Sequence, residues 1–433
     1  MKYYSTNKQS SLTSFKEATI LGQAPDRGLF FPERIPQVDK GLIVKISDFS
    51  DEEIAYRVIA PYVGSEIPEE KLRQIVSKTV NFPIPLIQVN DSIFSLELFH
   101  GPTLAFKDIG ARFMSRCLGY FVKDDSRKVT VLVATSGDTG GAVANGFYNV
   151  DGVEVVILYP SGKVSPVQEK QLTTLGNNIH ALEVTGTFDN CQQMVKQAFA
   201  DKELTQKKFL TSANSINVAR WLPQQFYYFF AYKQWLEKDS PLVISVPSGN
   251  FGNICAGILA MQSGLPVDHF IAACNVNDIV SDYLETQELK PRQAVATLSN
   301  AMDVGNPSNF VRILEIFQHQ FPALKSKLSS FSITDAETES VIDEVFKKYQ
   351  YTLDPHGAVG YLALQRYLAE HSNAKGIFLE TAHPVKFPEA VERATGQKIK
   401  LPEHISEIMD REKISTVISP EYEALRNFLL ETL

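Results

Sequence analysis

Two segments far apart in the chain carry residue types that could perform chemistry together. Residues 100–108 read His-Gly-Pro-Thr-Leu-Ala-Phe-Lys-Asp, and residues 248–253 read Ser-Gly-Asn-Phe-Gly-Asn. Lys107 follows Phe106 among other apolar residues, where desolvation favours the neutral amine that can form a Schiff base. The second segment follows an apolar run and precedes a helical pattern, so its N–H groups could converge on a phosphate. Together the segments predict a site for pyridoxal phosphate.

The composition is that of an ordinary soluble protein and permits such an enzyme. The chain has 433 residues, 44% of them hydrophobic, which is enough for a large core divided into two or three domains. A formal net charge of -8 disfavours nucleic acid and anionic membranes as partners. Four widely spaced cysteines predict neither a disulfide framework nor a metal site. The N-terminus lacks an apolar signal segment, and no run is long enough to span a bilayer, so we expect a cytoplasmic protein.

Hydrophobic periodicity predicts two α/β domains with mainly parallel sheets and an appended N-terminal domain. Short β-branched runs alternate with helical patterns, as in βα units. We expect strands at 129–134, 153–159, 179–184, 242–246, 270–273 and 376–379, and helices at 51–63, 139–148, 164–175, 336–349 and 358–371. The predicted domains are 1–95, appended and outside both sheets; 96–240, a smaller domain with the lysine and substrate loops; and 241–433, a larger domain with the cofactor-phosphate loop.

The loops that follow predicted strands carry further polar residues. In an open α/β sheet, ligands bind beyond the carboxyl ends of the strands. Ser136, Asp138 and Thr139 follow the run ending at residue 134 and open a helix, so this loop could hold a carboxylate. Thr381 follows the run ending near residue 379. A hydroxyl there, in place of a carboxylate, tolerates an unprotonated pyridine nitrogen.

These segments resemble those of threonine synthases, which are pyridoxal phosphate enzymes of fold type II. Four more strings extend the likeness over nearly the whole chain: Gly-Leu-Phe-Phe-Pro at 28–32, Ser-Ala-Asn-Ser-Ile-Asn at 212–217, Leu-Ser-Asn-Ala-Met-Asp at 298–303 and Asp-Pro-His-Gly-Ala at 354–358. The long N-terminal segment resembles the microbial and fungal branch. The resemblance implies conversion of O-phosphohomoserine and water to L-threonine and phosphate, the last step of threonine biosynthesis, by γ-elimination and β-addition of water.

The resemblance also implies roles for single residues. Lys107 is the expected Schiff-base lysine and the base that removes the α proton, and Thr381 is the expected partner of the pyridine nitrogen. The expected cofactor-phosphate loop consists of Gly249, Asn250, Phe251, Gly252 and Asn253. Asp138 stands where many relatives have an asparagine that donates to the phenolic oxygen of the cofactor. An ionised aspartate only accepts, so either a proton is shared there or the contact is made differently.

The substrate requires its own ligands. We expect Ser136, Thr139 and Asn217 to bind it, and the candidates for its phosphate are cations and a hydroxyl near active-site segments: Lys163, Ser165, Arg112 and Arg220. Lys163 and Ser165 are favoured, because they follow a predicted strand. For the two arginines, structural ion pairs are the alternative.

Two other functions remain open from the sequence. One is a different reaction of the same fold, such as a phospho-lyase or an amino-acid dehydratase, and the other is a sensor that binds the cofactor or an amino acid without catalysis. The chain has neither a nucleophile elbow nor a nucleotide-binding P-loop at these segments, which disfavours hydrolases and kinases. His100, His356 and His383 share no metal-ligand spacing, so structural hydrogen bonding is expected of them. A monomer or a homodimer is expected.

Overall fold

The computed structural model describes residues 1–123 and 128–433, which divide into two compact units. Unit 1 consists of Met1, Phe31–Phe106 and Trp221–Lys400, and unit 2 of Lys2–Phe30, Lys107–Arg220 and Leu401–Leu433. Neither unit is continuous in sequence. The division of the chain at residues 95 and 240 stays a prediction, and the two compact units follow different boundaries.

Unit 1 is built on a six-stranded sheet with the order β12-β11-β10-β13-β5-β4. Its strands are β4 (Leu86–Gln88), β5 (Ile93–Glu97), β10 (Leu242–Pro247), β11 (His269–Cys274), β12 (Leu328–Ser332) and β13 (Lys375–Glu380). All neighbours are parallel except β4, which is antiparallel to β5. The three strands predicted for this region are confirmed as β10, β11 and β13. The expectation that residues 1–95 contribute to neither sheet is wrong, because β4 lies within them.

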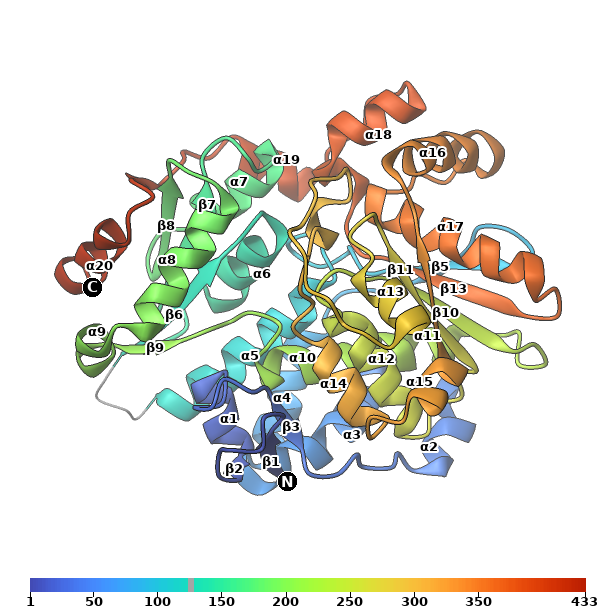
Figure 1. Ribbon diagram of the computed structural model, residues 1–433, viewed down its shortest axis with the longest axis horizontal. Coiled ribbons are helices and arrows are strands. Elements are labelled where there is room, and N and C mark those ends of the chain that lie inside the picture. Colours follow the sequence, from blue (N-terminus) through green and yellow to red (C-terminus); the bar gives the residue numbers. More distant parts are fainter. Residues whose placement is uncertain (124–127) are drawn as a thin grey trace. The chain divides into compact units, whose positions relative to one another are not determined.

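Helices cover both faces of this sheet, as expected for buried parallel strands. The helices of unit 1 are α2 (Lys40–Val44), α3 (Asp51–Val63), α4 (Glu69–Thr79), α11 (Phe226–Gln234), α12 (Gly252–Gln262), α13 (Ile279–Thr286), α14 (Phe310–Ile316), α15 (Phe321–Lys327), α16 (Asp335–Tyr349), α17 (Pro355–Glu370) and α18 (Pro388–Thr395). On one face Ser245 donates a hydrogen bond to Gly360 O in α17, which lies along β10 and β13 (Figure 1). On the other face Phe270 contacts Tyr228 of α11. The helices predicted at 51–63, 336–349 and 358–371 are confirmed.

Unit 2 contains a five-stranded parallel sheet with the order β14-β8-β7-β6-β9. Its strands are β6 (Val129–Ala134), β7 (Val153–Pro160), β8 (Ile179–Val184), β9 (Phe209–Thr211) and β14 (Thr416–Ile418). The three predicted strands are confirmed as β6, β7 and β8. One face of the sheet packs against Met194, Leu425 and Leu429 in a continuous hydrophobic core. The predicted mainly parallel α/β architecture is therefore present in both units.

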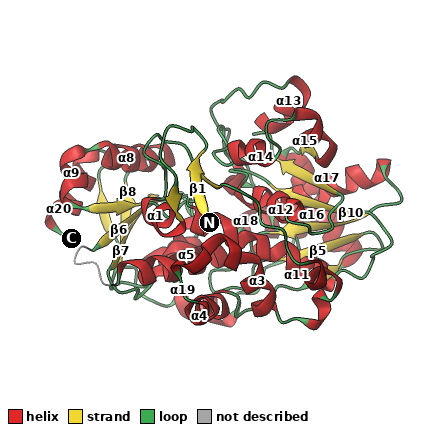
Figure 2. Cartoon of the chain, turned by 90° about the horizontal axis from the view of Figure 1, so that it is seen from below, coloured by secondary structure: helices red, strands yellow, loops and turns green. Residues whose placement is uncertain are grey.

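The helices of unit 2 flank its sheet, with α5 and α8 on opposite sides of the strands (Figure 2). They are α1 (Phe15–Leu21), α5 (Lys107–Val122), α6 (Asp138–Phe147), α7 (Pro166–Thr173), α8 (Phe188–Ala200), α9 (Lys202–Lys207), α19 (Glu403–Met409) and α20 (Tyr422–Glu431). The helices predicted at 139–148 and 164–175 are confirmed as α6 and the shorter α7. A small antiparallel pair, β1 (Lys2–Ser5) and β2 (Thr13–Ser14), precedes α1.

The chain crosses between the units after residues 1, 30, 106, 220 and 400. β3 (Phe30–Pro32) and α10 (Val218–Trp221) each contain a crossing, and another falls between Phe106 and Lys107. Across residues 1–123 and 128–433, no helix combines the length and the apolar character needed to cross a bilayer.

Candidate active site

In unit 2, Lys107 is the first residue of α5 and faces the start of α6. Its Nζ lies 3.9 Å from Asp138 Oδ2, and the two side chains are only 16% and 4% exposed. The structure therefore brings two of the predicted cofactor residues together in a largely desolvated place. The Asp138 carboxylate can balance the charge of the Lys107 ammonium there, because opposite charges attract more strongly away from water.

Asp138 is held by a residue that the sequence did not single out. Gln168 Nε2 donates a hydrogen bond to Asp138 Oδ1 at 2.9 Å. Gln168 also accepts the N–H of Ser165 through Oε1 at 3.1 Å, and its own N–H donates to Ser165 Oγ at 3.4 Å. This reciprocal pair is a capping box at the start of α7. The Ser-x-x-Gln spacing at 165–168 was the signal that could have identified Gln168.

The turn before α6 presents free backbone donors. Thr135 Oγ1 accepts the N–H groups of Gly137 and Gly140, each at 2.9 Å, and so fixes the turn at the end of β6. Ser136 and Thr139 are half-buried, and their N–H groups donate no hydrogen bond within the described residues. The start of α6 thus provides donors suited to an anion, as predicted for a carboxylate.

The favoured phosphate candidates lie on the loop between β7 and α7. Lys163 is exposed, and its N–H donates to Pro160 O at 3.3 Å in the turn after β7. Ser165 is half-buried and serves as the N-cap of α7. Its Oγ is engaged as an acceptor, but the hydroxyl proton can still be donated. Through Gln168, this loop is connected to Asp138.

The other candidates occupy structural positions. Asn217 is fully buried, and its amide donates to Thr19 O at 2.8 Å and accepts the N–H of Ala219 at 2.9 Å. Arg220 is buried and donates to Ala213 O at 2.6 Å. Arg112 is half-buried in α5, where burial lowers the pKa of its guanidinium. The substrate roles of these three residues stay predictions.

In unit 1, the predicted cofactor-phosphate loop leads from β10 into α12. Phe251 adopts a left-handed conformation, with φ 61° and ψ 13°, directly before the helix. The N–H groups of Gly249, Gly252 and Asn253 donate no hydrogen bond to any described residue. A Cβ atom at Gly249 would lie 2.6 Å from Met302 Cα and 2.9 Å from Ala301 O, so the loop admits no side chain there. These unused donors fit the phosphate of the cofactor.

The side chains of the same loop have structural roles. Asn253 Nδ2 donates to Pro247 O at 2.8 Å, and its Oδ1 accepts the N–H of Ile254 at 2.9 Å. Asn250 Oδ1 accepts the N–H of Ser308 at 2.7 Å. The backbone N–H groups of Gly249, Gly252 and Asn253 are therefore donors that the loop can offer to a phosphate, and the role of the Asn250 amide stays a prediction.

Thr381 lies beside the segment that precedes Lys107. Its carbonyl accepts the N–H of Phe106 at 2.9 Å, and Ala105 forms a β-bridge with Ala382. The Thr381 side chain is 5% exposed, and no described residue is hydrogen-bonded to its hydroxyl. The hydroxyl is therefore available to a ring nitrogen. Within unit 1, these backbone contacts fix Thr381 next to Phe106, the residue that directly precedes Lys107.

Two residues not predicted from the sequence hold this segment. Lys386 is buried and donates to Thr103 O at 2.8 Å, and Tyr227 donates from its hydroxyl to Phe106 O.

His383 accepts the N–H of Val385 through Nδ1 at 3.1 Å. Burial, with a smaller contribution from His100, lowers the pKa of His383 to about 4, so the imidazole is neutral at pH 7. This agrees with a hydrogen-bonding role for His383.

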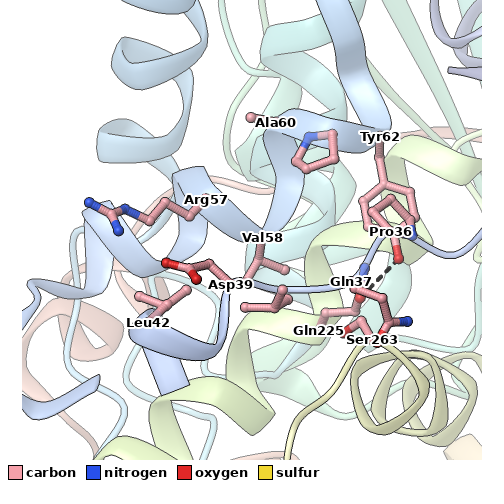
Figure 3. A pocket seen from close by; sticks show the side chains of 12 residues that line it. Pro36, Gln37, Asp39, Leu42, Arg57, Val58, Ala60, Tyr62, Gln225 and Ser263 are labelled. Atoms are coloured by element: carbon pink, nitrogen blue, oxygen red, sulfur yellow. Dashed lines mark hydrogen bonds between the residues drawn. The ribbon is translucent and has the colours of Figure 1, made fainter. Parts of the chain in front are cut away.

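Unit 1 also contains two hollows whose walls include none of the predicted site residues. One, of about 320 Å³, is lined mainly by apolar side chains such as Pro36, Leu42 and Val58, with Tyr62 donating to Gln225 at 3.5 Å (Figure 3). The second, of about 370 Å³, has Glu97, Tyr351 and His383 in its wall. Within 1–123 and 128–433, no group of three or more His, Cys, Asp or Glu side chains is arranged to hold a metal ion.

Family models match three successive parts of the chain. Residues 2–80 match the model described as "Threonine synthase N terminus", and residues 357–429 match "Threonine synthase, C-terminal". Residues 80–379 match "Pyridoxal-phosphate dependent enzyme", which covers more than half of the chain. The cofactor predicted from Lys107 and the glycine-rich loop is therefore confirmed.

Full-length relatives give the same result. The threonine synthase of Haemophilus influenzae is 44% identical over 433 residues, covering 100% of both chains. The crystal structure of threonine synthase from Escherichia coli matches with a TM-score of 0.93 and 43% identity, again over 100% of both chains. A PLP-bound threonine synthase from Brucella melitensis matches with a TM-score of 0.93, 36% identity and coverage of 99% and 98%. The resemblance and the fold type II architecture are thus confirmed. The chain therefore belongs to the threonine synthase family of pyridoxal-phosphate-dependent enzymes.

Proposed function

We propose that this enzyme converts O-phosphohomoserine and water into L-threonine and phosphate. The observation that carries the proposal is the pairing of Lys107 with Asp138 at the start of α6, beside free N–H groups. A base and an anion-binding turn in one place suit an amino acid, because the base can act at the α carbon while the turn holds the carboxylate.

Lys107 is the proposed base, and the Asp138 carboxylate influences the balance between the neutral amine and the ammonium form of Lys107. Pyridoxal phosphate, when bound, supplies an electron sink that stabilises negative charge next to the α carbon. The Lys107 amine has to be neutral to accept a proton from that carbon, and partial burial favours the neutral form, whereas Asp138 favours the ammonium that results. Lys107 can therefore hold the proton after it has left the α carbon. Loss of a β proton then allows the γ-phosphate to leave, the γ carbon takes up a proton, and water adds at the β carbon to give L-threonine.

The remaining predicted residues have proposed roles in binding. Ser136 and Thr139 hold the substrate carboxylate through their N–H groups and hydroxyls, and Lys163 and Ser165 bind the departing phosphate. Gly249, Gly252 and Asn253 hold the cofactor phosphate, and Thr381 faces the pyridine nitrogen. We propose a cytoplasmic monomer or homodimer.

The product identifies the reaction. The cofactor-loaded enzyme should convert O-phosphohomoserine into threonine and phosphate, detected by mass spectrometry and a phosphate assay, whereas boiled enzyme should not. A 2-oxo acid with phosphate would replace the proposal with a phospho-lyase. Tight binding of an amino acid without any product would instead indicate a sensor.

Replacing Lys163 with alanine should raise KM for O-phosphohomoserine about tenfold and lower turnover, because one charged phosphate contact is lost. The absorbance spectrum of the bound cofactor should stay unchanged. Lys196 is an exposed lysine on α8 of the same unit, and Lys196→Ala serves as the matched control. Parent kinetics in Lys163→Ala would remove this residue from the phosphate site.

A further inference from the structure

Three ionisable residues form a buried, hydrogen-bonded cluster in unit 1. Glu380, at the end of β13, and Asp354, the N-cap of α17, are both 0% exposed, and His356 in α17 is 2% exposed. Asp354 N–H donates to Glu380 Oε1 at 2.7 Å, and Asp354 Oδ1 lies 2.5 Å from His356 Nδ1. Burial of three such groups is costly unless they are bonded to one another, so the arrangement needs a reason.

The hydrogen bonds fix where the protons are. His356 Nε2 accepts the N–H of Ala301 at 3.2 Å, so the imidazole proton is on Nδ1, where it is donated to Asp354. Asp354 also accepts the N–H groups of His356 and Gly357, at 2.8 Å and 3.2 Å, which suits an ionised carboxylate. Burial and the Asp354 charge raise the pKa of Glu380 well above its usual range.

The Glu380 end and the His356 end of this cluster lie next to two different parts of the proposed cofactor site in unit 1. Glu380 directly precedes Thr381. At the other end, Ala301 belongs to the short helix η4 (Asn300–Met302), whose backbone packs against Gly249. A Cβ atom on Gly249 would lie only 2.6 Å from Met302 Cα and 2.9 Å from Ala301 O, so the loop packs directly against η4 and a shift of η4 has to move the loop as well.

We propose that Asp354 and His356 are positioning residues that hold the cofactor-phosphate loop, through the contact of His356 with Ala301. The inference rests on the proposed role of the loop in binding the cofactor phosphate. Asp354 fixes the imidazole tautomer, and the imidazole fixes the η4 backbone against which Gly249 lies. The N–H groups of the loop are then aimed before the cofactor arrives, so less ordering is required on binding.

Two substitutions of His356 test the two hydrogen bonds of its imidazole ring separately. His356→Asn has an amide that reaches only as far as Nδ1, so it keeps the donor to Asp354 but loses the acceptor for Ala301. His356→Gln reaches Nε2, so it keeps the acceptor for Ala301. Titration of each apoprotein with pyridoxal phosphate, followed by absorbance, should give a Kd about tenfold weaker for His356→Asn, and within about threefold of the parent for His356→Gln.

Three controls make the result decisive. Thermal midpoints of the apoproteins show whether both variants are folded. His269→Asn changes another histidine of unit 1, which contacts Ser329 and stacks on Tyr367, and should leave the Kd unchanged. Gly249→Ala tests the loop itself and should weaken binding strongly. Equal weakening by His356→Asn, His356→Gln and His269→Asn would overturn the proposal.

The experiment also distinguishes the two levels of inference. Parent affinity in His356→Asn, with weak binding in Gly249→Ala, would reject the positioning role while supporting the loop assignment. Parent affinity in Gly249→Ala would reject the loop assignment, and the positioning role with it.

Discussion

Turnover of O-phosphohomoserine is expected to fall by on the order of 10³-fold or more when Lys107 is replaced with alanine, because the proposed base at the α carbon is lost. The cofactor should also lose its covalent attachment. Borohydride reduction followed by peptide mass spectrometry should label the peptide containing Lys107 in the parent and leave Lys107→Ala unlabelled. Lys107 is 16% exposed and pairs with Asp138, so the site has room for an added small amine in the variant.

Chemical rescue tests the assignment further. A primary amine such as ethylamine should restore part of the turnover of Lys107→Ala, in proportion to its concentration, because it replaces the missing base. Lys196→Ala, as the matched surface control, should keep parent turnover and parent labelling. Turnover of Lys107→Ala at the parent rate, or labelling of a different lysine, would show that Lys107 is not the cofactor lysine.

Replacing Gly357 with alanine should lower the free energy of unfolding by about 3 kcal/mol, which is large for one methyl group. A Cβ atom there would lie 1.5 Å from Glu380 Oε2 and 2.4 Å from Glu380 Cδ. The carboxyl cannot move away easily, because it is fully buried and its other oxygen accepts the N–H of Asp354. Calorimetry of the apoprotein measures the effect and can resolve separate transitions of the two units.

Gly360→Ala is the matched control for this substitution. Gly360 lies on the same helix, and a Cβ atom there would meet the Pro247 side chain at 3.2 Å, a contact that small shifts can relieve. Alanine favours a helix over glycine by roughly 1 kcal/mol, so Gly360→Ala should change stability by about 1 kcal/mol at most. Equal stability of both variants would mean that Glu380 does not approach Gly357 as closely as the structure places it.

The central strands could be predicted from the sequence, but the edges of the sheets could not. β6 and β8 begin and end at the predicted residues, 129–134 and 179–184. β5 was missed because Ser95 and Glu97 make it look too polar for a buried strand. The Tyr351 hydroxyl lies within hydrogen-bond distance of both side chains, at 2.9 Å from each, and Tyr351 is more than 250 residues away in sequence. Only the tertiary fold brings Tyr351 to β5, so the sequence alone does not reveal this contact.

The candidate site shows the same division. Lys107 was identifiable as a lysine among apolar residues, and the turn at 136–139 and the loop at 249–253 because each combines polar or flexible residues with the end of a predicted strand. Gln168 and His356 were not identified as parts of the site. They act on Asp138 and Ala301, which lie 30 and 55 residues away, so only the folded chain brings them to their partners.

The five-stranded sheet of unit 2 has a consequence for biosynthesis. β14, which pairs with β8, is synthesised long after it. Thr185, just after β8, donates from Oγ1 to Ile418 O, which is 233 residues further along the chain. At ribosomal rates of about 5–20 residues per second, the edge of β8 stays uncovered for roughly 10–50 s of synthesis. Unit 1 ends at Lys400, so it is fully synthesised first. An exposed edge invites pairing with other chains, and a nascent unit 2 is therefore the part of this protein most in need of a chaperone.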